Sequence, residues 1–196
     1  YAIARGKPAE LSLLMRDADN MVRREKLLRS QSTRSGLVNT MMTLLEARDF
    51  ITEGHAERLE QLVVSLAERM GFASNQLDAM RLFAKFHDIG KVGISDAILF
   101  KPGPLTEEER TEMRRHSEIG YRIALASSDL VYVAEWILRH HEWWDGSGYP
   151  IGLSGTEIPI ECRILSIVDA YDAMTSDRPY RQAMPAEQAV AELRKF

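Results

Sequence analysis

The sequence has one cysteine, Cys162, among its 196 residues. An internal disulfide is therefore impossible, and a reducing compartment, the cytoplasm, is the expected location. Cys162 lies in the apolar run CRILSIVDA. We expect it to pack in the core and not to act as a nucleophile.

The sequence also lacks an excess of basic residues and any long hydrophobic run. Its 25 Lys and Arg against 29 Asp and Glu give a formal net charge of −4, which argues against long-range attraction of a nucleic-acid polymer. No apolar run reaches the ~18 residues that span a bilayer, and no signal-peptide pattern is present. An anionic substrate would need a local source of positive charge, such as bound metal ions.

Strand signals are sparse, whereas apolar residues recur at three- and four-residue steps, which predicts an all-α fold. One helix is expected over about 59–70, ended by Gly71. A second, over about 77–86, delivers His87 and Asp88 near its end, and Gly90 and Gly93 then break it.

Further helices are expected in the second half of the chain. Thr106 and Glu109 form a capping box that begins a helix carrying His116 and running to about Leu125. Another covers about 130–141, and the glycine- and proline-rich stretch 142–159 predicts a long loop. Helix resumes over about 161–175, and a last helix opens near Pro185.

Residues 1–34 differ in character from the rest. They form a highly charged segment with a thin apolar stripe, which predicts a connector helix or a dimerising helix. The chain begins with Tyr1 and not with Met, so we expect it to be a piece of a longer protein.

All five histidines lie in settings that suit a metal ligand. His87 is followed by Asp88, and His140 by His141. The full set of expected donors is His55, His87, Asp88, His116, His140, His141 and Asp169. These seven donors are too many for one ion and suit two, and two ions held ~3.5–4 Å apart are the usual device of phosphoryl hydrolysis. The sequence therefore predicts a metal-dependent hydrolase.

The donor types narrow the choice of metal. Imidazole and carboxylate without thiolate favour iron or manganese, with nickel or zinc as alternatives, over copper(I) or an iron–sulfur cluster. Taken alone, His55 or His116 is more often a surface or core residue than a ligand. Their occurrence together with Lys91, the glycine-rich loop and Asp169 favours the metal interpretation.

Three segments resemble the HD-GYP family, the HD-superfamily phosphodiesterases that degrade cyclic di-GMP. They are HDIGKVGISDAILFKPGPLT, HHEWWDGSGYPIGLSG and ILSIVDAYDAMTSDRPYR, and the similarity extends over about 37–193. The resemblance implies an HD-domain helical bundle, a cytoplasmic hydrolase and cyclic di-GMP as its partner molecule.

The resemblance also implies roles for the donors. His55, His87, Asp88 and Asp169 would hold one ion, and Asp88 would bridge to a second ion held by His116, His140 and His141. Some members bind a third ion through a glutamate that is replaced here by Ile51, so a two-metal centre is implied. Asp172 would add a hydrogen bond behind the ligands.

The implied substrate contacts are as follows. Lys91 would contact a phosphate oxygen, and Arg178 and Arg181 of RPYR would reach phosphate or a guanine edge. As alternatives, Lys91 would be a surface cation at a helix end, and the arginines would form ordinary salt bridges. Tyr149, in the GYP triplet, would shape the cleft, and Asp49 would orient Lys91 or take up a leaving-group proton.

The pair Trp143 and Trp144 precedes the GYP triplet. The first stands where the family commonly has a basic residue, so a cation facing substrate or partner is missing. Tryptophans are also good packing residues, and we expect at least one of the two to be packed.

Two expectations concern domains. The stretch DADNMVRREK is similar to the closing helix of GGDEF domains, which implies that residues 1–34 are a connector, the tail of an upstream GGDEF domain in the parent chain, with a homodimer through this helix as a further possibility. Residues 35–196 would be the HD-GYP domain, lacking a terminal helix that the family normally has.

The expected reaction is attack of a metal-bridging hydroxide on one phosphorus of cyclic di-GMP, in line with its 3′ oxygen, to give pGpG and in a second cut GMP. Two alternatives stay open. One is a catalytically idle cyclic di-GMP sensor or partner-docking scaffold, and the other is a hydrolase of a different nucleotide.

Overall fold

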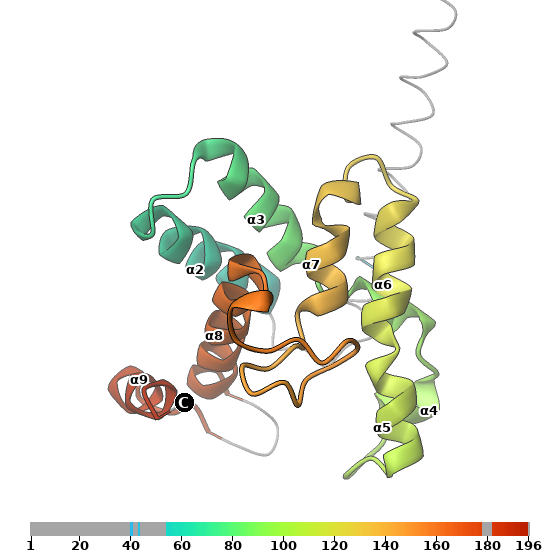
Figure 1. Ribbon diagram of the computed structural model, residues 1–196. Coiled ribbons are helices and arrows are strands. Elements are labelled where there is room, and N and C mark those ends of the chain that lie inside the picture. Colours follow the sequence, from blue (N-terminus) through green and yellow to red (C-terminus); the bar gives the residue numbers. More distant parts are fainter. Residues whose placement is uncertain (1–39, 41–42, 44–53, 178–181, 196) are drawn as a thin grey trace, which may run out of the picture.

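The computed structural model describes Thr40, Thr43 and residues 54–177 and 182–195 (Figure 1). In these residues the chain is helical, and its one extended pairing is an isolated antiparallel bridge between Asp145 and Ser154. The all-α prediction is confirmed. Among the described residues, none of the helices combines the length and hydrophobicity that a membrane span requires.

The helices follow one another with short connections. They are α2 (His55–Arg69), α3 (Ser74–Phe86), η1 (Ile89–Gly93), α4 (Asp96–Leu99), α5 (Glu107–Arg114), α6 (His116–Leu125), η2 (Val131–Val133), α7 (Ala134–Arg139), η3 (Gly155–Glu157), α8 (Ile160–Thr175) and α9 (Ala186–Leu193), where η marks a 3-10 helix. The predicted ends at Gly71, Thr106 and Pro185 are close to the observed ones, and 142–159 is a loop apart from η3.

The core forms where α2, α3, α7 and α8 meet. On α2 the buried residues Leu59, Val63 and Ala67 recur every four positions, so one stripe of the helix faces α3 and α8. Phe83 of α3 is fully buried and packs edge-on against Trp136, with ring centroids 5.6 Å apart. Cys162 is buried in this core, as predicted, and burial raises the pKa of its thiol.

One predicted helix is divided in two. The sequence predicts a single helix from Thr106 to about Leu125, whereas α5 ends at Arg114 and α6 begins at His116. At this junction the carbonyl of Met113 accepts a hydrogen bond from Nδ1 of His116, and that of Arg114 accepts one from Oγ of Ser117. In an unbroken helix these two carbonyls would accept hydrogen bonds from backbone amides, whereas here they accept hydrogen bonds from side chains. Figure 1 shows α5 and α6 stacked end to end.

Two glycines let η1 pack directly on α6. A Cβ added to Gly90 would lie 1.8 Å from the carbonyl oxygen of His116 and 2.5 Å from the amide nitrogen of Gly120. No larger residue fits this contact, because real Cβ atoms do not approach so closely. The contact brings the start of η1, with Asp88 just before it, beside the start of α6 and His116.

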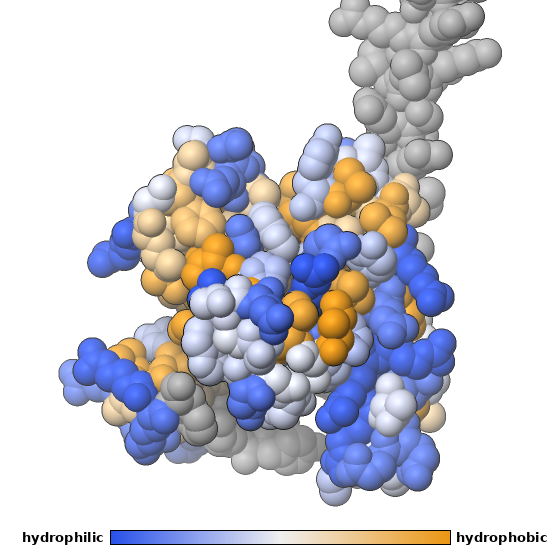
Figure 2. Space-filling model, in the orientation of Figure 1, coloured by the Kyte–Doolittle hydropathy of each residue, from blue (hydrophilic) through white to orange (hydrophobic). Residues whose placement is uncertain are grey.

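The surface in Figure 2 is strongly hydrophilic over α5 and carries apolar groups nearer the centre of the view. The first feature follows from the α5 sequence EEERTEMR, which buries no residue. Large exposed apolar residues in the loop after α7 include Trp143, Trp144 and Ile151.

The N-terminal predictions lie outside the described residues. These are the connector helix over 1–34, its resemblance to the tail of a GGDEF domain and the dimer through it. The division of the chain at residue 35 stays a prediction for the same reason.

Candidate metal centre

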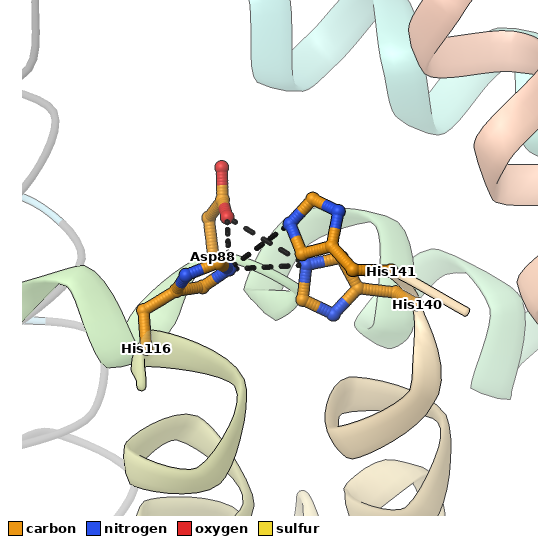
Figure 3. Close-up of side chains that lie close together, drawn as sticks. All are labelled: Asp88, His116, His140 and His141. Carbon is orange, nitrogen blue, oxygen red and sulfur yellow. Dashed lines mark hydrogen bonds and ion pairs between the residues drawn. The ribbon is translucent and has the colours of Figure 1, made fainter. Parts of the chain in front are cut away.

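Asp88 lies at the centre of a compact group of polar side chains, between the end of α3 and the start of η1 (Figure 3). Its Oδ1 is 3.4 Å from Nε2 of His116 and 3.8 Å from Nε2 of His140. Its Oδ2 is 2.8 Å from Nζ of Lys91 and 3.3 Å from Nε2 of His87. One carboxylate therefore faces three imidazoles and an ammonium group.

Four of these side chains can supply ligand atoms to one ion. Asp88, His116, His140 and His141 each place one donor atom within 4.8 Å of those of the others. Figure 3 shows the imidazoles of His116, from the start of α6, and of His140 and His141, from the end of α7, pointing toward Asp88. Three separate parts of the chain thus converge on one point.

Backbone carbonyls fix the direction in which three of the imidazoles point. The Nδ1 atoms of His87, His116 and His140 lie 2.8, 2.7 and 2.7 Å from the carbonyl oxygen three residues earlier. A carbonyl only accepts, so each Nδ1 carries a proton, and in the neutral form of each ring Nε2 has a free lone pair. This is the usual outer contact of a metal-binding histidine.

These lone pairs face one another. Nε2 of His116 lies 3.3 Å from Nε2 of His140 and 3.1 Å from Nε2 of His141. Acceptor atoms at such distances repel unless a proton or a cation lies between them, and Asp88 adds a negative charge to the same space. The donor set therefore fits a divalent transition metal ion.

Burial keeps the imidazoles of His116 and His141 uncharged. It lowers the pKa of His116 to about 4 and that of His141 to about 2, where the neighbouring His140 adds to the effect. Both rings are therefore neutral at pH 7, the state that binds a metal. Burial also opposes ionisation of Asp88, but Lys91 and His87 outweigh it and hold the pKa of Asp88 well below its ordinary value.

A second group of predicted ligands lies next to this cluster and outside it. Nε2 of His55, at the start of α2, is 3.7 Å from Oδ1 of Asp169 on α8. Burial lowers the pKa of His87, but the charge and hydrogen bond of Asp88, the charge of Asp169 and the bond to the Ala84 carbonyl together outweigh it and leave this pKa raised. Asp169 therefore lies close to His87. Asp88, His116, His140 and His141 thus form one group and His55 with Asp169 a second, and His87 interacts with Asp88 of the first group and with Asp169 of the second.

Asp172 holds His55 in place. Its Oδ2 is 2.6 Å from Nδ1 of His55, and its Oδ1 accepts a hydrogen bond of 2.7 Å from Nε of Arg58. The predicted hydrogen bond at Asp172 is therefore present, with Asp172 as its acceptor. Burial raises the pKa of this carboxyl, but its bonds to Arg58 and His55 outweigh that effect and leave it lowered.

Tyr149 covers His141 from the loop that follows α7. The two rings stack with centroids 4.8 Å apart and an angle of 25° between their planes. The guanidinium of Arg114 lies 5.1 Å from the centroid of the Tyr149 ring. Tyr149 therefore borders the cluster, where it was expected to shape the cleft.

The remaining predictions have mixed outcomes. Asp49, Arg178 and Arg181 lie outside the described residues. The expected packing of at least one tryptophan is wrong, because Trp143 and Trp144 are 60% and 61% exposed. Trp144 still has a cation partner, since the guanidinium of Arg163 lies 5.8 Å from its ring.

Sequence reasoning missed three residues that support the site. They are Arg58, which binds Asp172, Arg114, which lies over Tyr149, and the buried Glu142. Only Glu142 had a signal in the sequence, because a carboxylate directly after the paired histidines and ahead of a glycine-rich loop is well placed to bind loop amides.

Comparison with known proteins identifies related chains. A family model described as "HD domain" matches residues 39–196. A "Cyclic di-GMP phosphodiesterase" of Thermotoga maritima is 47% identical over 152 residues, which are 76% of this chain and 41% of that protein. A "3'3'-cGAMP-specific phosphodiesterase 2" of Vibrio cholerae is 39% identical over 165 residues, 83% of this chain and 32% of that protein.

A solved structure shares the fold. An HD-GYP-type protein of Bdellovibrio bacteriovorus aligns with a TM-score of 0.57 and 20% identity, covering 83% of this chain and 55% of that one. The chain spans about two fifths or less of the length of the two phosphodiesterases it matches.

Proposed function

The chain belongs to the HD domain family, and from this premise we propose that it is a metal-dependent phosphodiesterase that hydrolyses cyclic di-GMP to pGpG. The observation that carries the proposal is the convergence of the Nε2 atoms of His116, His140 and His141 on the Asp88 carboxylate. The names of relatives at 47% and 39% identity supply the substrate class, a cyclic dinucleotide.

The seven donors divide into two ligand sets that share Asp88. One set is His55, His87, Asp88 and Asp169, and the other is Asp88, His116, His140 and His141. Asp88 suits the shared position because its Oδ1 faces His116 and His140 while its Oδ2 faces His87. When bound, two iron or manganese ions supply a water of lowered pKa and positive charge for the phosphoryl oxygens.

Lys91 provides a fixed cation beside the ions. Its Nζ is 2.8 Å from Oδ2 of Asp88, and its side chain is 20% exposed. From this position the ammonium group reaches a phosphoryl oxygen of a bound substrate and stabilises the charge that develops there. It also keeps the Asp88 carboxylate ionised and ready to bind metal.

Tyr149 supplies a neutral donor at the edge of the site. Burial raises the pKa of its phenol, so the hydroxyl keeps its proton at any physiological pH. A protonated phenol donates a hydrogen bond to a phosphate oxygen or to a guanine edge.

The reaction needs no covalent intermediate with the protein. The oxygen of water forms a bond to phosphorus, the bond from phosphorus to the 3′ oxygen breaks, and a proton passes to that oxygen. The ring opens and linear pGpG is released.

A turnover assay tests the proposal. The protein is purified without oxygen, loaded with iron(II) or manganese(II), and incubated separately with cyclic di-GMP and with 3'3'-cGAMP, and the products are separated by chromatography. We expect cyclic di-GMP to be cleaved faster and chelation to stop the reaction. Faster cleavage of 3'3'-cGAMP would identify that dinucleotide as the substrate instead. Tight binding of cyclic di-GMP by metal-loaded protein, without cleavage, would indicate a sensor.

A further inference from the structure

The Glu142 carboxylate is buried and binds three consecutive backbone amides. Its side chain is 4% exposed. Oε1 accepts a 2.7 Å hydrogen bond from the amide of Ile151, Oε2 accepts one of 2.8 Å from Leu153, and the amide of Gly152 lies 3.2 and 3.0 Å from the two oxygens. Hydrogen bonds to a buried carboxylate are stronger than those between neutral groups.

These bonds close the loop that follows the paired histidines. Glu142 lies at the beginning of the loop and residues 151–153 lie further along it, so the carboxylate ties the return segment to the start. A second hydrogen bond, of 3.1 Å, joins neighbouring parts of the same loop: the amide of Tyr149 donates to the carbonyl of His141, one residue before Glu142. Between them the loop folds back closely, since a Cβ on Gly148 would lie 2.3 Å from the amide nitrogen of Trp143.

The closed loop places one aromatic ring on one metal-binding imidazole. Tyr149 stacks on His141 at 4.8 Å, and Nε2 of His141 lies 3.1 Å from Nε2 of His116. Unlike His87, His116 and His140, His141 has no recorded bond from Nδ1 to a backbone carbonyl among the described residues. The direction of this imidazole is therefore set by contacts with other rings: it stacks on Tyr149 and lies against His140, at a centroid distance of 4.0 Å, and against His116, at 4.9 Å. Tyr149 is the one of these three partners that is not a predicted ligand, and its position depends on the loop.

We propose that Glu142 is a positioning residue that sets the affinity of the ion held by Asp88, His116, His140 and His141, by keeping Tyr149 stacked on His141. Glu142 touches neither the ion nor the substrate. The inference rests on the metal centre of the proposed function, and it gives a role to a residue that lies inside the HHEWWDGSGYP segment but is not one of the seven donors.

The bonding pattern requires a carboxylate at this position. All three partners are donors, so a glutamine would offer one oxygen and would turn its own NH2 group toward an amide N–H. Glu142→Gln should therefore open part of the loop without removing bulk. Loss of an outer contact of this kind lowers metal affinity roughly 10-fold to 100-fold.

Glu157→Gln is the matched control. Glu157 lies in the same loop, and its carboxylate also accepts from a backbone amide, that of Ser154 at 3.1 Å. It is exposed and caps only η3. The two variants make the same chemical change and lose the same charge, so a difference between them reports the position of the carboxylate.

The experiment measures metal binding without substrate. The full chain is stripped with a chelator and titrated with manganese(II) by calorimetry, and the dissociation constants of both ions are compared for wild type, Glu142→Gln and Glu157→Gln. We expect Glu142→Gln to weaken one ion about 10-fold or more and to leave the other unchanged, and Glu157→Gln to match wild type. Equal weakening of both ions, or none, would overturn the proposal.

A double-mutant cycle tests the route through the imidazole. If Glu142 acts through His141, Glu142→Gln should have little further effect in the His141→Ala background. Additive losses in the double variant would show a different route and reject the proposal. Circular dichroism of the metal-free variants verifies folding, and Glu142→Asp, which keeps the carboxylate, should recover part of the affinity.

The outcomes separate this inference from the proposed function. Wild-type affinities in Glu142→Gln together with hydrolysis by the wild type would reject only the inference. The expected change in affinity without hydrolysis by any metal-loaded form would reject only the proposed reaction.

Discussion

Nζ of Lys91 lies 2.8 Å from Oδ2 of Asp88, three residues apart at the start of the 3-10 helix η1. In an α-helix, with 3.6 residues per turn, side chains three residues apart are offset around the helix axis. The tighter 3-10 geometry places residues i and i+3 directly above one another. The cation and the shared carboxylate therefore act as one unit.

Replacing Asp88 should abolish the centre. Asp88→Asn keeps the size of the side chain but removes the charge that two ions would share, so we expect turnover of cyclic di-GMP to fall roughly 100-fold or more. Metal analysis by mass spectrometry should show fewer than two ions per chain. A variant that retains two ions and wild-type turnover would disprove the shared role.

Replacing Lys91 should affect chemistry more than metal content. Lys91→Met keeps the aliphatic stem and removes the charge that stabilises the phosphoryl oxygens, so we expect kcat to fall about 100-fold. Lys195→Met serves as a control for charge, because Lys195 is exposed and forms a surface ion pair with Glu192. Steady-state kinetics and metal analysis are measured on the same samples. If Lys91 only holds the structure together, the variant should lose both ions, and its kcat per metal-loaded enzyme should equal that of wild type.

The packing of η1 on α6 predicts a strong effect at Gly90. A Cβ there would lie 1.8 Å from a backbone oxygen, whereas the nearest atoms to a Cβ on Gly93 would be side-chain atoms of Ile119, at 3.0 and 3.1 Å. We expect Gly90→Ala to lower the free energy of unfolding by about 3 kcal/mol and Gly93→Ala by about 1 kcal/mol or less. Urea unfolding of both variants tests the difference, and equal values would contradict the close contact.

Asp172 should control the second group of ligands. Asp172→Asn weakens the bond to Nδ1 of His55, so we expect one ion to bind roughly 10-fold to 100-fold more weakly. Asp78→Asn is a suitable control, since Asp78 is an exposed partner of Arg81. Combined with Glu142→Gln, the variant should weaken both ions, and calorimetry that showed both changes on the same ion would contradict the division into two ligand sets.

The buried His116 predicts how the metal-free protein responds to acid. Its pKa is about 4 in the folded state and about 6.5 when unfolded, so the unfolded state binds more protons between these values. Stability is therefore full above about pH 6.5 and falls as the pH falls through this window. At pH 5, His116 alone should lower the free energy of unfolding by about 2 kcal/mol from its value well above pH 6.5.

Other histidines also affect how the stability of the metal-free protein depends on pH. His141 acts in the same direction, because its pKa is also lowered, whereas His87, whose pKa is raised, stabilises the fold at lower pH and loses this contribution as the pH rises. The comparison that isolates one group is His116→Gln against wild type, by urea unfolding with chelator at several pH values. A variant with the same slope as wild type would show that His116 does not carry the effect.

Much of the fold follows from local signals in the sequence. The three- and four-residue spacing of Leu59, Leu62, Val63, Leu66 and Met70 predicts α2, and the capping box of Thr106 and Glu109 marks the start of α5. The break before His116 was not predictable, because it depends on a ring nitrogen bonding a carbonyl that helical periodicity assigns to the backbone.

Less of the site than of the helices could be predicted from the sequence. The donor residues could be predicted from the paired motifs, and Asp88, His116, His140 and His141 do converge. The distance between this cluster and the pair of His55 with Asp169 depends on how α2 and α8 pack, which no local pattern gives. The exposure of Trp143 and Trp144 has the same origin, since it follows from the path of the loop that Glu142 closes.

The most direct test of the account is a crystal structure of the iron- or manganese-loaded chain, with data collected at the absorption edge of the metal. The account predicts two anomalous peaks on either side of Asp88, one bound by His116, His140 and His141 and the other by His55, His87 and Asp169. A single peak in fully loaded crystals, or two peaks that do not share Asp88, would contradict it.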